Sequence, residues 1–274
     1  MSALNAGEII FTDQLGREIF IPQPPRRIIS LVPSQTELLH ELGLEEEVVG
    51  ITKFCIHPEK WFLSKKKVGG TKDFKPDVIR QLQPDLILAN KEENTAEGLA
   101  ELMDEFPVWV SDVNTLKEAL SMIKSVGEMT NRKEPSVEFI HQIEENFNQL
   151  KEFLHQLPYQ NSRVAYYIWK EPWMIAGKST FINSMLQECG LTSIGTKTRY
   201  PEINFDELHS EKPDFIFLSS EPFPFKESDK SHFSEIISPD KVIMVDGEYF
   251  SWYGSRLKNA PSYFKSLLKS LPGI

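Results

Sequence analysis

The sequence has little cysteine, no long apolar run and a shortage of basic charge. Its 274 residues include 2 cysteines, Cys55 and Cys189, without CxxC spacing, so a disulfide framework is excluded and two free thiols are expected. No apolar run approaches the roughly 20 residues that span a bilayer, so we expect no transmembrane segment. With 30 Lys and Arg against 40 Asp and Glu, the net charge of -10 disfavours a nucleic-acid partner.

Motifs of common nucleotide and hydrolase sites are also absent. Neither GxGxxG nor GxSxG occurs, which leaves dinucleotide binding and an α/β-hydrolase triad without support. Gly177–Thr180 (GKST) matches the end of a P-loop, but that motif needs a glycine five residues earlier, where Pro172 stands. We therefore expect this segment to cap a helix, and we expect no enzymatic activity.

Strand and helix patterns alternate along the chain, which favours an α/β fold with mainly parallel sheets. The segment Ile9–Ile21 comes first and predicts a hairpin around Asp13–Gly16. Ser34 and Glu37 have the spacing of a capping box and predict a helix that runs to Gly43. The other expected strands are Arg27–Val32, Val48–Thr52, Asp85–Ala89, Val108–Val110, Arg163–Trp169, Asp214–Ser219 and Lys241–Val245. The other expected helices of the two ends are Pro76–Leu82, Ala96–Phe106, Phe205–Ser210 and Ala260–Leu271.

The middle of the chain predicts helices only. Thr115–Met129 is followed by a second, longer helix from Pro135, which carries apolar residues at three- and four-residue steps as far as Leu157. At 1.5 Å per residue this helix is about 35 Å long. We expect an N-terminal lobe over residues 1–112, a helical connector over 113–157 and a C-terminal lobe over 158–274.

The two ends of the chain repeat each other. Asp77 lies eight positions before Asp85, Asp206 lies eight before Asp214, and one offset of 129 residues relates both pairs. This predicts two similar α/β lobes on either side of the long helix, with a ligand cleft between them.

Five segments together resemble a known family: RRIISLVPSQTELLHELGL, GITKFCIHP, KPDVIRQLQPDLILAN, INFDELHSEKPDFIFL and VDGEYFSWYGSRL. They resemble the substrate-binding proteins of ABC importers for cobalamin, haem and iron–siderophore complexes, and VPSQTELL and GITKFC resemble those for cobalamin most. The resemblance implies a monomeric receptor without a cofactor of its own, which binds a large metal chelate and delivers it to a permease and ATPase. It also implies a periplasmic or extracytoplasmic location. Because Met1–Ala6 has no secretory pattern, either a leader precedes this sequence or the protein is cytoplasmic.

The same resemblance assigns two docking acids. Asp77 and Asp206 match the acids, one per lobe, through which the family meets permease arginines. Each stands at the start of an expected short helix, where negative charge is favourable, so a purely local role in helix stability is the alternative.

The ligand site is expected in loops that follow strands, where aromatic rings offer flat apolar faces. By the resemblance, Phe54, Tyr200 and Tyr249 fall at or beside ligand contacts, and Asn90 stands where relatives carry a tryptophan. His57 is a candidate metal contact, paired with Cys55 at CxH spacing. The expected ligand-binding residues are Lys53, Phe54, Cys55, His57, Trp169, Trp173, Tyr200, Tyr249, Phe250, Trp252, Tyr253 and Arg256.

Three alternatives stay open. In the first, the chelate is haem or an iron–siderophore complex rather than cobalamin. In the second, the protein is a leaderless scavenger or sensor of the same ligand, without any transporter. The third is a leaderless cytoplasmic enzyme that handles metals or tetrapyrroles on the same fold, with Cys55, His57 and His209 as its candidate residues.

Overall fold

The structure is a computed structural model that describes residues 8–22, 24–157 and 161–272. The chain forms two compact units. Unit 1 holds the chain up to Val113, then Lys117–His141 and the short stretch Tyr253–Ser255. Unit 2 holds Asn114–Leu116, Gln142–Trp252 and the chain from Arg256 onward. The predicted start of the C-terminal lobe at residue 158 and the leader question at Met1–Ala6 lie outside the described residues.

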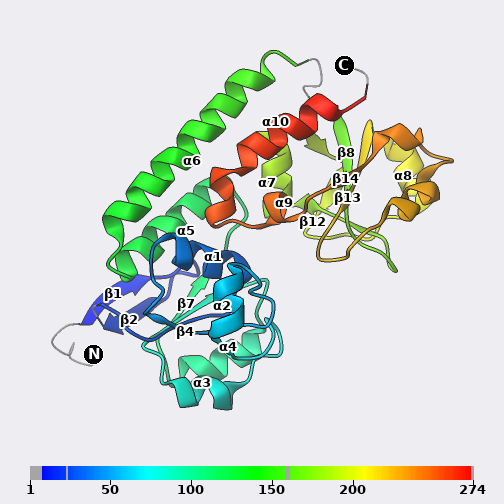
Figure 1. Ribbon diagram of the computed structural model, residues 1–274. Coiled ribbons are helices and arrows are strands. Elements are labelled where there is room, and N and C mark those ends of the chain that lie inside the picture. The colour runs from blue at the N-terminus through cyan, green and yellow to red at the C-terminus, as the bar shows by residue number, and fades with distance from the viewer. Residues whose placement is uncertain (1–7, 23, 158–160, 273–274) are drawn as a thin grey trace. The chain divides into compact units, whose positions relative to one another are not determined.

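Unit 1 contains a sheet of five strands, all parallel, in the order β5-β4-β3-β6-β7. Ile79 of α3 and Leu99 of α4 pack with Ile29 and Ile87 of the sheet in one apolar core, and Figure 1 shows α3 and α4 on the same side of the strands. The strands are β3 (Ile28–Ser30), β4 (Val48–Ile51), β5 (Lys66–Lys67), β6 (Leu86–Asn90) and β7 (Val108–Ser111). The helices are α1 (Pro33–Glu41), α2 (Glu59–Ser64), α3 (Pro76–Leu82), α4 (Ala96–Met103) and α5 (Leu116–Met129).

Unit 2 repeats this order with the path β11-β8-β13-β14, all parallel, and β9 pairs antiparallel with β8. The strands are β8 (Arg163–Trp169), β9 (Met174–Ile175), β11 (Thr192–Ser193), β13 (Phe215–Ser219) and β14 (Val242–Val245), and a separate pair is formed by β10 (Gly177–Lys178) and β12 (Gly195–Thr198). The helices are α7 (Phe181–Glu188), α8 (Phe205–Glu211), α9 (Glu248–Ser251) and α10 (Ala260–Ser270), with 3₁₀ turns η1 (Glu227–Phe233), η2 (Pro239–Lys241) and η3 (Ser255–Lys258). Two similar α/β units with parallel sheets are thus confirmed.

The repeated aspartates have matching structural tasks. Asp85 accepts the backbone N–H groups of Arg26 and Arg27 at 2.7 and 2.8 Å, just before β3. Asp214 accepts the backbone N–H of Arg163 at 2.7 Å, at the start of β8. In each unit, an aspartate in the turn before one strand therefore binds the backbone at the beginning of the neighbouring strand.

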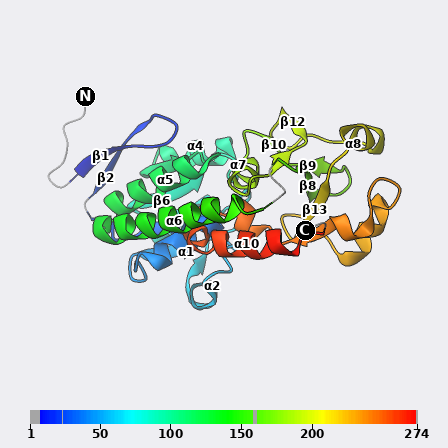
Figure 2. The same ribbon diagram turned by 90° about the horizontal axis from the view of Figure 1, so that it is seen from above.

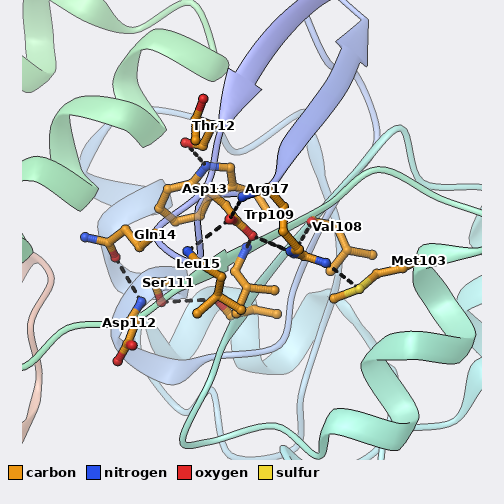
Figure 3. Close-up of polar contacts among 12 residues, drawn as sticks. Thr12, Asp13, Gln14, Leu15, Arg17, Met103, Val108, Trp109, Ser111 and Asp112 are labelled. Atoms are coloured by element: carbon orange, nitrogen blue, oxygen red, sulfur yellow. Dashed lines mark hydrogen bonds and ion pairs between the residues drawn. The ribbon is translucent and has the colours of Figure 1, made fainter. Parts of the chain in front are cut away.

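An N-terminal hairpin of β1 (Glu8–Thr12) and β2 (Glu18–Pro22) is attached to the edge strand β7. In Figure 3 the buried carboxylate of Asp13 accepts the backbone N–H groups of Leu15 and Arg17, at 3.0 and 2.9 Å, and pairs with the Arg17 guanidinium. The Trp109 indole N–H donates to the Thr12 carbonyl at 3.3 Å. The predicted hairpin is therefore confirmed, and its turn covers an otherwise open sheet edge.

The long predicted helix exists as α6 (Lys133–Leu154), drawn as one continuous helix in Figure 2. Its residues up to His141 belong to unit 1 and those from Gln142 to unit 2. It begins two residues before Pro135. The proline is tolerated there because N–H groups in the first turn of a helix have no intrahelical acceptor, so the N–H that proline lacks is not needed. It ends three residues before Leu157.

Two cap predictions have opposite outcomes. Thr180 caps α7, and its hydroxyl accepts the Asn183 N–H at 3.1 Å, so the helix-cap interpretation of GKST is confirmed. The capping box at Ser34 is wrong, because Pro33 already occupies the first turn of α1 and no side chain caps it. The carboxylate of Glu37 instead accepts the Ser255 hydroxyl at 2.8 Å.

Candidate functional site

The carboxyl ends of the parallel strands define one edge of each sheet, and most of the expected ligand residues follow these strands. In open α/β sheets such edges are where ligands bind. In unit 1 the relevant loops follow β4 and β6. In unit 2 they follow β8, β13 and β14.

The loop after β4 presents exposed side chains. Phe54 is 51% exposed. The ammonium of Lys53 lies 5.1 Å from the centre of the Phe54 ring and 3.2 Å from the Asp73 carboxylate. His57 lies further along the same loop and is half-buried. This loop therefore offers an open ring face with a cation beside it.

Cys55 does not belong to that surface. Its side chain is buried, and its sulfur lies 3.1 Å from the hydroxyl oxygens of both Thr36 and Thr52. Burial raises the pKa of the thiol, so it stays protonated at neutral pH. Cys55 is therefore absent from the exposed surface of this loop. Among the described residues no group of three or more His, Cys, Asp and Glu is arranged to hold a metal ion.

Behind the exposed loop lies a buried polar cluster that the sequence did not reveal. The Gln35 amide donates to the Ser111 hydroxyl at 2.7 Å, and the Asn90 amide reaches the same oxygen at 3.0 Å. The Asn90 side-chain oxygen also accepts the backbone N–H groups of Glu92 and Glu93, at 2.8 and 3.1 Å. Asn90 therefore shapes the loop after β6, which gives a structural reason for an asparagine there instead of a tryptophan.

Tyr253 belongs to the short stretch of unit 1 whose flanking residues, Trp252 and Arg256, belong to unit 2. It is buried, and its hydroxyl donates to the Glu93 carboxylate at 3.0 Å. Burial, followed by the charge of Glu93, raises the pKa of this phenol. A Cβ at Gly254 would lie 2.3 Å from the Ser34 carbonyl oxygen. Tyr253, one of the expected ligand-binding residues, is thus a buried anchor of this segment.

The two tryptophans after β8 differ in their surroundings. Trp169 is 41% exposed and meets the Phe223 ring edge-on at 5.7 Å. Trp173 is half-buried, stacks on Phe225 at 5.9 Å and packs against Phe233 at 5.3 Å. Tyr200 lies between β12 and α8 and is also half-buried. Trp169 therefore offers the larger open surface.

The segment after β14 combines core and surface residues. Tyr249 is half-buried and stacks on Tyr263 at 4.6 Å. Phe250 is buried against Tyr166 and Phe264, with ring centres 5.1 and 4.8 Å away. Phe250 therefore belongs to the core of unit 2, because α9 turns its side chain inward.

Trp252 and Arg256 form a small network with two acids. Trp252 is also buried, with 8% of its surface exposed, and its indole N–H donates to the Glu221 carboxylate at 3.0 Å. The Arg256 guanidinium lies 4.8 Å from the centre of the Trp252 ring and 2.7 Å from the Glu248 carboxylate. Glu221 is not among the residues expected from the sequence, although its place two residues after the buried strand β13 could have indicated it.

The two expected docking acids both occupy the first turn of a short helix. Asp77 is in α3 and its side chain is 90% exposed, while Asp206 is in α8 and is also exposed. A cavity of about 380 Å³ lies beside Asp206, and Ile175, Ile194 and Ile203 are among the residues that line it.

Among the described helices, α6 included, none combines the length and the apolarity of a bilayer-spanning segment.

Open ring faces, a guanidinium and carboxylates suit the non-covalent binding of a large, partly apolar ligand. The chain is similar to proteins with such a role. It is 24% identical over 217 residues to a vitamin B12-binding protein of Vibrio campbellii, a match that spans 77% of this chain and 75% of that protein. It is 22% identical to an uncharacterized ABC transporter substrate-binding lipoprotein of Bacillus subtilis, over 91% of this chain and 82% of that one.

Among solved structures, the periplasmic vitamin B12-binding protein of Vibrio cholerae shares the fold. Its TM-score is 0.79 at 21% identity, over 92% of this chain and 99% of that one. Residues 28–242 match the family described as periplasmic binding protein. This match covers most of the sequence, and the chain therefore belongs to the periplasmic binding protein family.

Proposed function

We propose that the chain is the substrate-binding component of an ABC importer and that it binds a large metal chelate, with cobalamin as the first candidate. Membership of the periplasmic binding protein family supports the binding role. The names of two relatives supply the chelate and the transporter class, vitamin B12 in one and an ABC transporter in the other. The observation that carries the proposal is the set of exposed aromatic residues at the carboxyl edges, above all Phe54 and Trp169.

In unit 1 the proposed contacts come from Lys53, Phe54 and His57. In unit 2 they come from loops after β8, β12 and β14. Each large ring contributes about 150–250 Å² of apolar surface when it is covered by a ligand. The proposed contacts of unit 2 are Trp169, Trp173, Tyr200, Tyr249, Trp252 and Arg256.

The second step is delivery. Asp77 and Asp206 are proposed to pair with arginines of the permease. Ion pairs at an exposed surface contribute about 0–1 kcal/mol each, so these acids would orient the complex more than hold it together. The proposed protein is monomeric, acts outside the cytoplasm and carries no cofactor of its own.

Haem or an iron–siderophore complex is the second candidate ligand. His57 favours this variant, because an imidazole in the loop after β4 is of a type that binds an open axial position of iron. The enzyme alternative loses one of its candidate residues, since Cys55 is buried and protonated.

A direct binding experiment tests the proposal. The purified protein is titrated with cyanocobalamin, haemin and a ferric hydroxamate while visible absorption is recorded. We expect saturable binding of one of them at a ratio of one to one. Tyr249→Ala should weaken it by about twofold to tenfold, in line with the roughly 0.5–1.5 kcal/mol of a stacked ring contact. Lys124→Ala, on the exposed face of α5, is the matched control and should bind as the wild type. Failure of all three chelates to bind would reject the proposal.

A further inference from the structure

The side chain of Glu221 accepts hydrogen bonds from two donors that belong to another segment of unit 2. Its Oε1 atom accepts the Trp252 indole N–H at 3.0 Å. The Ser251 hydroxyl donates to the same oxygen, and it also lies 2.9 Å from the Gly247 carbonyl oxygen. One carboxylate oxygen thus connects the loop after β13 to the end of α9.

The backbone at Gly247 packs closely against the Glu221 side chain. A Cβ at Gly247 would lie 2.7 Å from the Glu221 Cγ and 2.3 Å from the Ser219 Oγ, so only glycine allows the backbone to approach so closely. The Ser219 hydroxyl donates to the Glu221 carbonyl oxygen at 2.6 Å. Both ends of Glu221, backbone and side chain, are therefore held.

The Trp252 ring in turn contacts the charged side chain of Arg256. The Arg256 guanidinium lies 4.8 Å from the Trp252 ring centre, within the range of a cation–π contact. Glu248 binds the same guanidinium at 2.7 Å, and Tyr249 lies 5.9 Å from it. If the indole turned, Arg256 would lose the nearer of these two rings, while the ion pair with Glu248 and the more distant Tyr249 ring would remain.

The network also has an electrostatic consequence. Burial is the first cause that raises the pKa of Glu221, and the negative charges of Glu248 and Asp246 raise it further. The hydrogen bonds from Ser251 and Trp252 act in the opposite direction. The other titratable groups that face this acid are the phenol of Tyr166 on β8 and, through Trp252, the guanidinium of Arg256.

We propose that Glu221 is a positioning residue for the ligand-binding surface of unit 2. It holds the Trp252 indole, and through that ring it sets the direction in which Arg256 meets polar groups of the ligand. This inference rests on the proposed function, because it assigns Arg256 to the ligand site. Glu221 acts through Trp252 and makes no ligand contact itself.

Two readouts test the proposal. The first is the Trp252 indole ¹H–¹⁵N resonance, assigned by its loss in Trp252→Phe, and it needs no ligand. The second is the dissociation constant for cyanocobalamin. Glu221→Ala should shift the indole resonance and weaken binding about tenfold. Glu221→Gln keeps an acceptor oxygen and should restore most of both. Glu235→Ala removes an exposed glutamate of the same unit and should change neither.

A pH titration separates this role from general stability. In the wild type the indole resonance should move with a midpoint above 4.5, the ordinary value for this carboxyl, and in Glu221→Gln that movement should disappear. The inference is overturned if the indole resonance is unshifted in Glu221→Ala. It is also overturned if the wild type binds the chelate and Glu221→Ala shifts the resonance but binds with the same affinity. A wild type that binds no chelate rejects the proposed function instead, and the indole resonance still decides whether Glu221 holds Trp252.

Discussion

The Asp77 carboxylate lies 3.0 Å from the Arg80 guanidinium, one turn further along α3. Arg80 also binds Glu101 and Glu105, each at 2.7 Å. Among the residues that the structure describes, Asp206 has no comparable cation on α8. The two acids proposed for docking therefore start from different electrostatic situations, since a permease arginine would have to compete with Arg80 for Asp77.

This asymmetry predicts unequal effects on transport. Asp206→Ala should lower the uptake rate by about twofold to fivefold, the range of an exposed ion pair worth up to about 1 kcal/mol. Asp77→Ala should lower uptake less, and neither should change the affinity for the chelate. Uptake is measured with the reconstituted importer, and Lys124→Ala is the control. Equal losses, or a larger loss in Asp77→Ala, would show that Arg80 does not weaken the first contact.

The sequence was sufficient for the two-unit plan, because short buried strands, helix patterns and the Asp77–Asp85 repeat are local signals. It failed where a side chain's partner comes from a distant segment. Glu37 has the spacing of a capping box, yet it binds Ser255. Cys55 and Phe250 lie in segments rich in expected site residues, yet tertiary packing turns them inward. The place of Glu221 after β13 could have marked it as a candidate, but its role depends on Trp252, 31 residues away.

The buried thiols predict slow chemistry with a thiol reagent. Burial raises the pKa of both Cys55 and Cys189, so below those raised values the neutral thiol, which is the unreactive form, dominates. At pH 8 the native protein should react with Ellman's reagent far more slowly than the protein in 6 M guanidinium chloride, which should release two equivalents. Fast reaction of one thiol in the native state would return Cys55 to the list of accessible site residues.

The hairpin turn predicts a measurable loss of stability. Asp13→Ala leaves the Leu15 and Arg17 N–H groups without their side-chain acceptor and removes the ion pair of the Arg17 guanidinium, which keeps the Val108 carbonyl oxygen. We expect the free energy of unfolding to fall by about 1–3 kcal/mol, as judged from urea denaturation. Asp13→Asn retains one acceptor oxygen and should lose less. A change below about 0.5 kcal/mol for Asp13→Ala would mean that the turn contributes little to unit 1.

The return of the chain to unit 1 predicts a strict requirement at Gly254. In Gly254→Ala the new Cβ would collide with the Ser34 carbonyl oxygen, 2.3 Å away, so the backbone must move. We expect a loss of about 1–3 kcal/mol in thermal or urea unfolding, as for other overpacked sites. Ser255→Ala removes only the hydrogen bond to Glu37 and should lose less. Equal stability of Gly254→Ala and the wild type would contradict this close approach.

The central claim is that the chelate contacts the carboxyl edges of the two sheets, and hydrogen–deuterium exchange with and without saturating chelate tests it most directly. The opposite edges provide internal controls, because Gln83–Asp85 and Lys212–Asp214 lie at the amino ends of β6 and β13. We predict slower exchange after β4, β8 and β14, in segments 53–57, 169–174 and 246–256, and unchanged exchange at the two control turns. Protection confined to the control turns, or protection nowhere despite saturation, would contradict the claim.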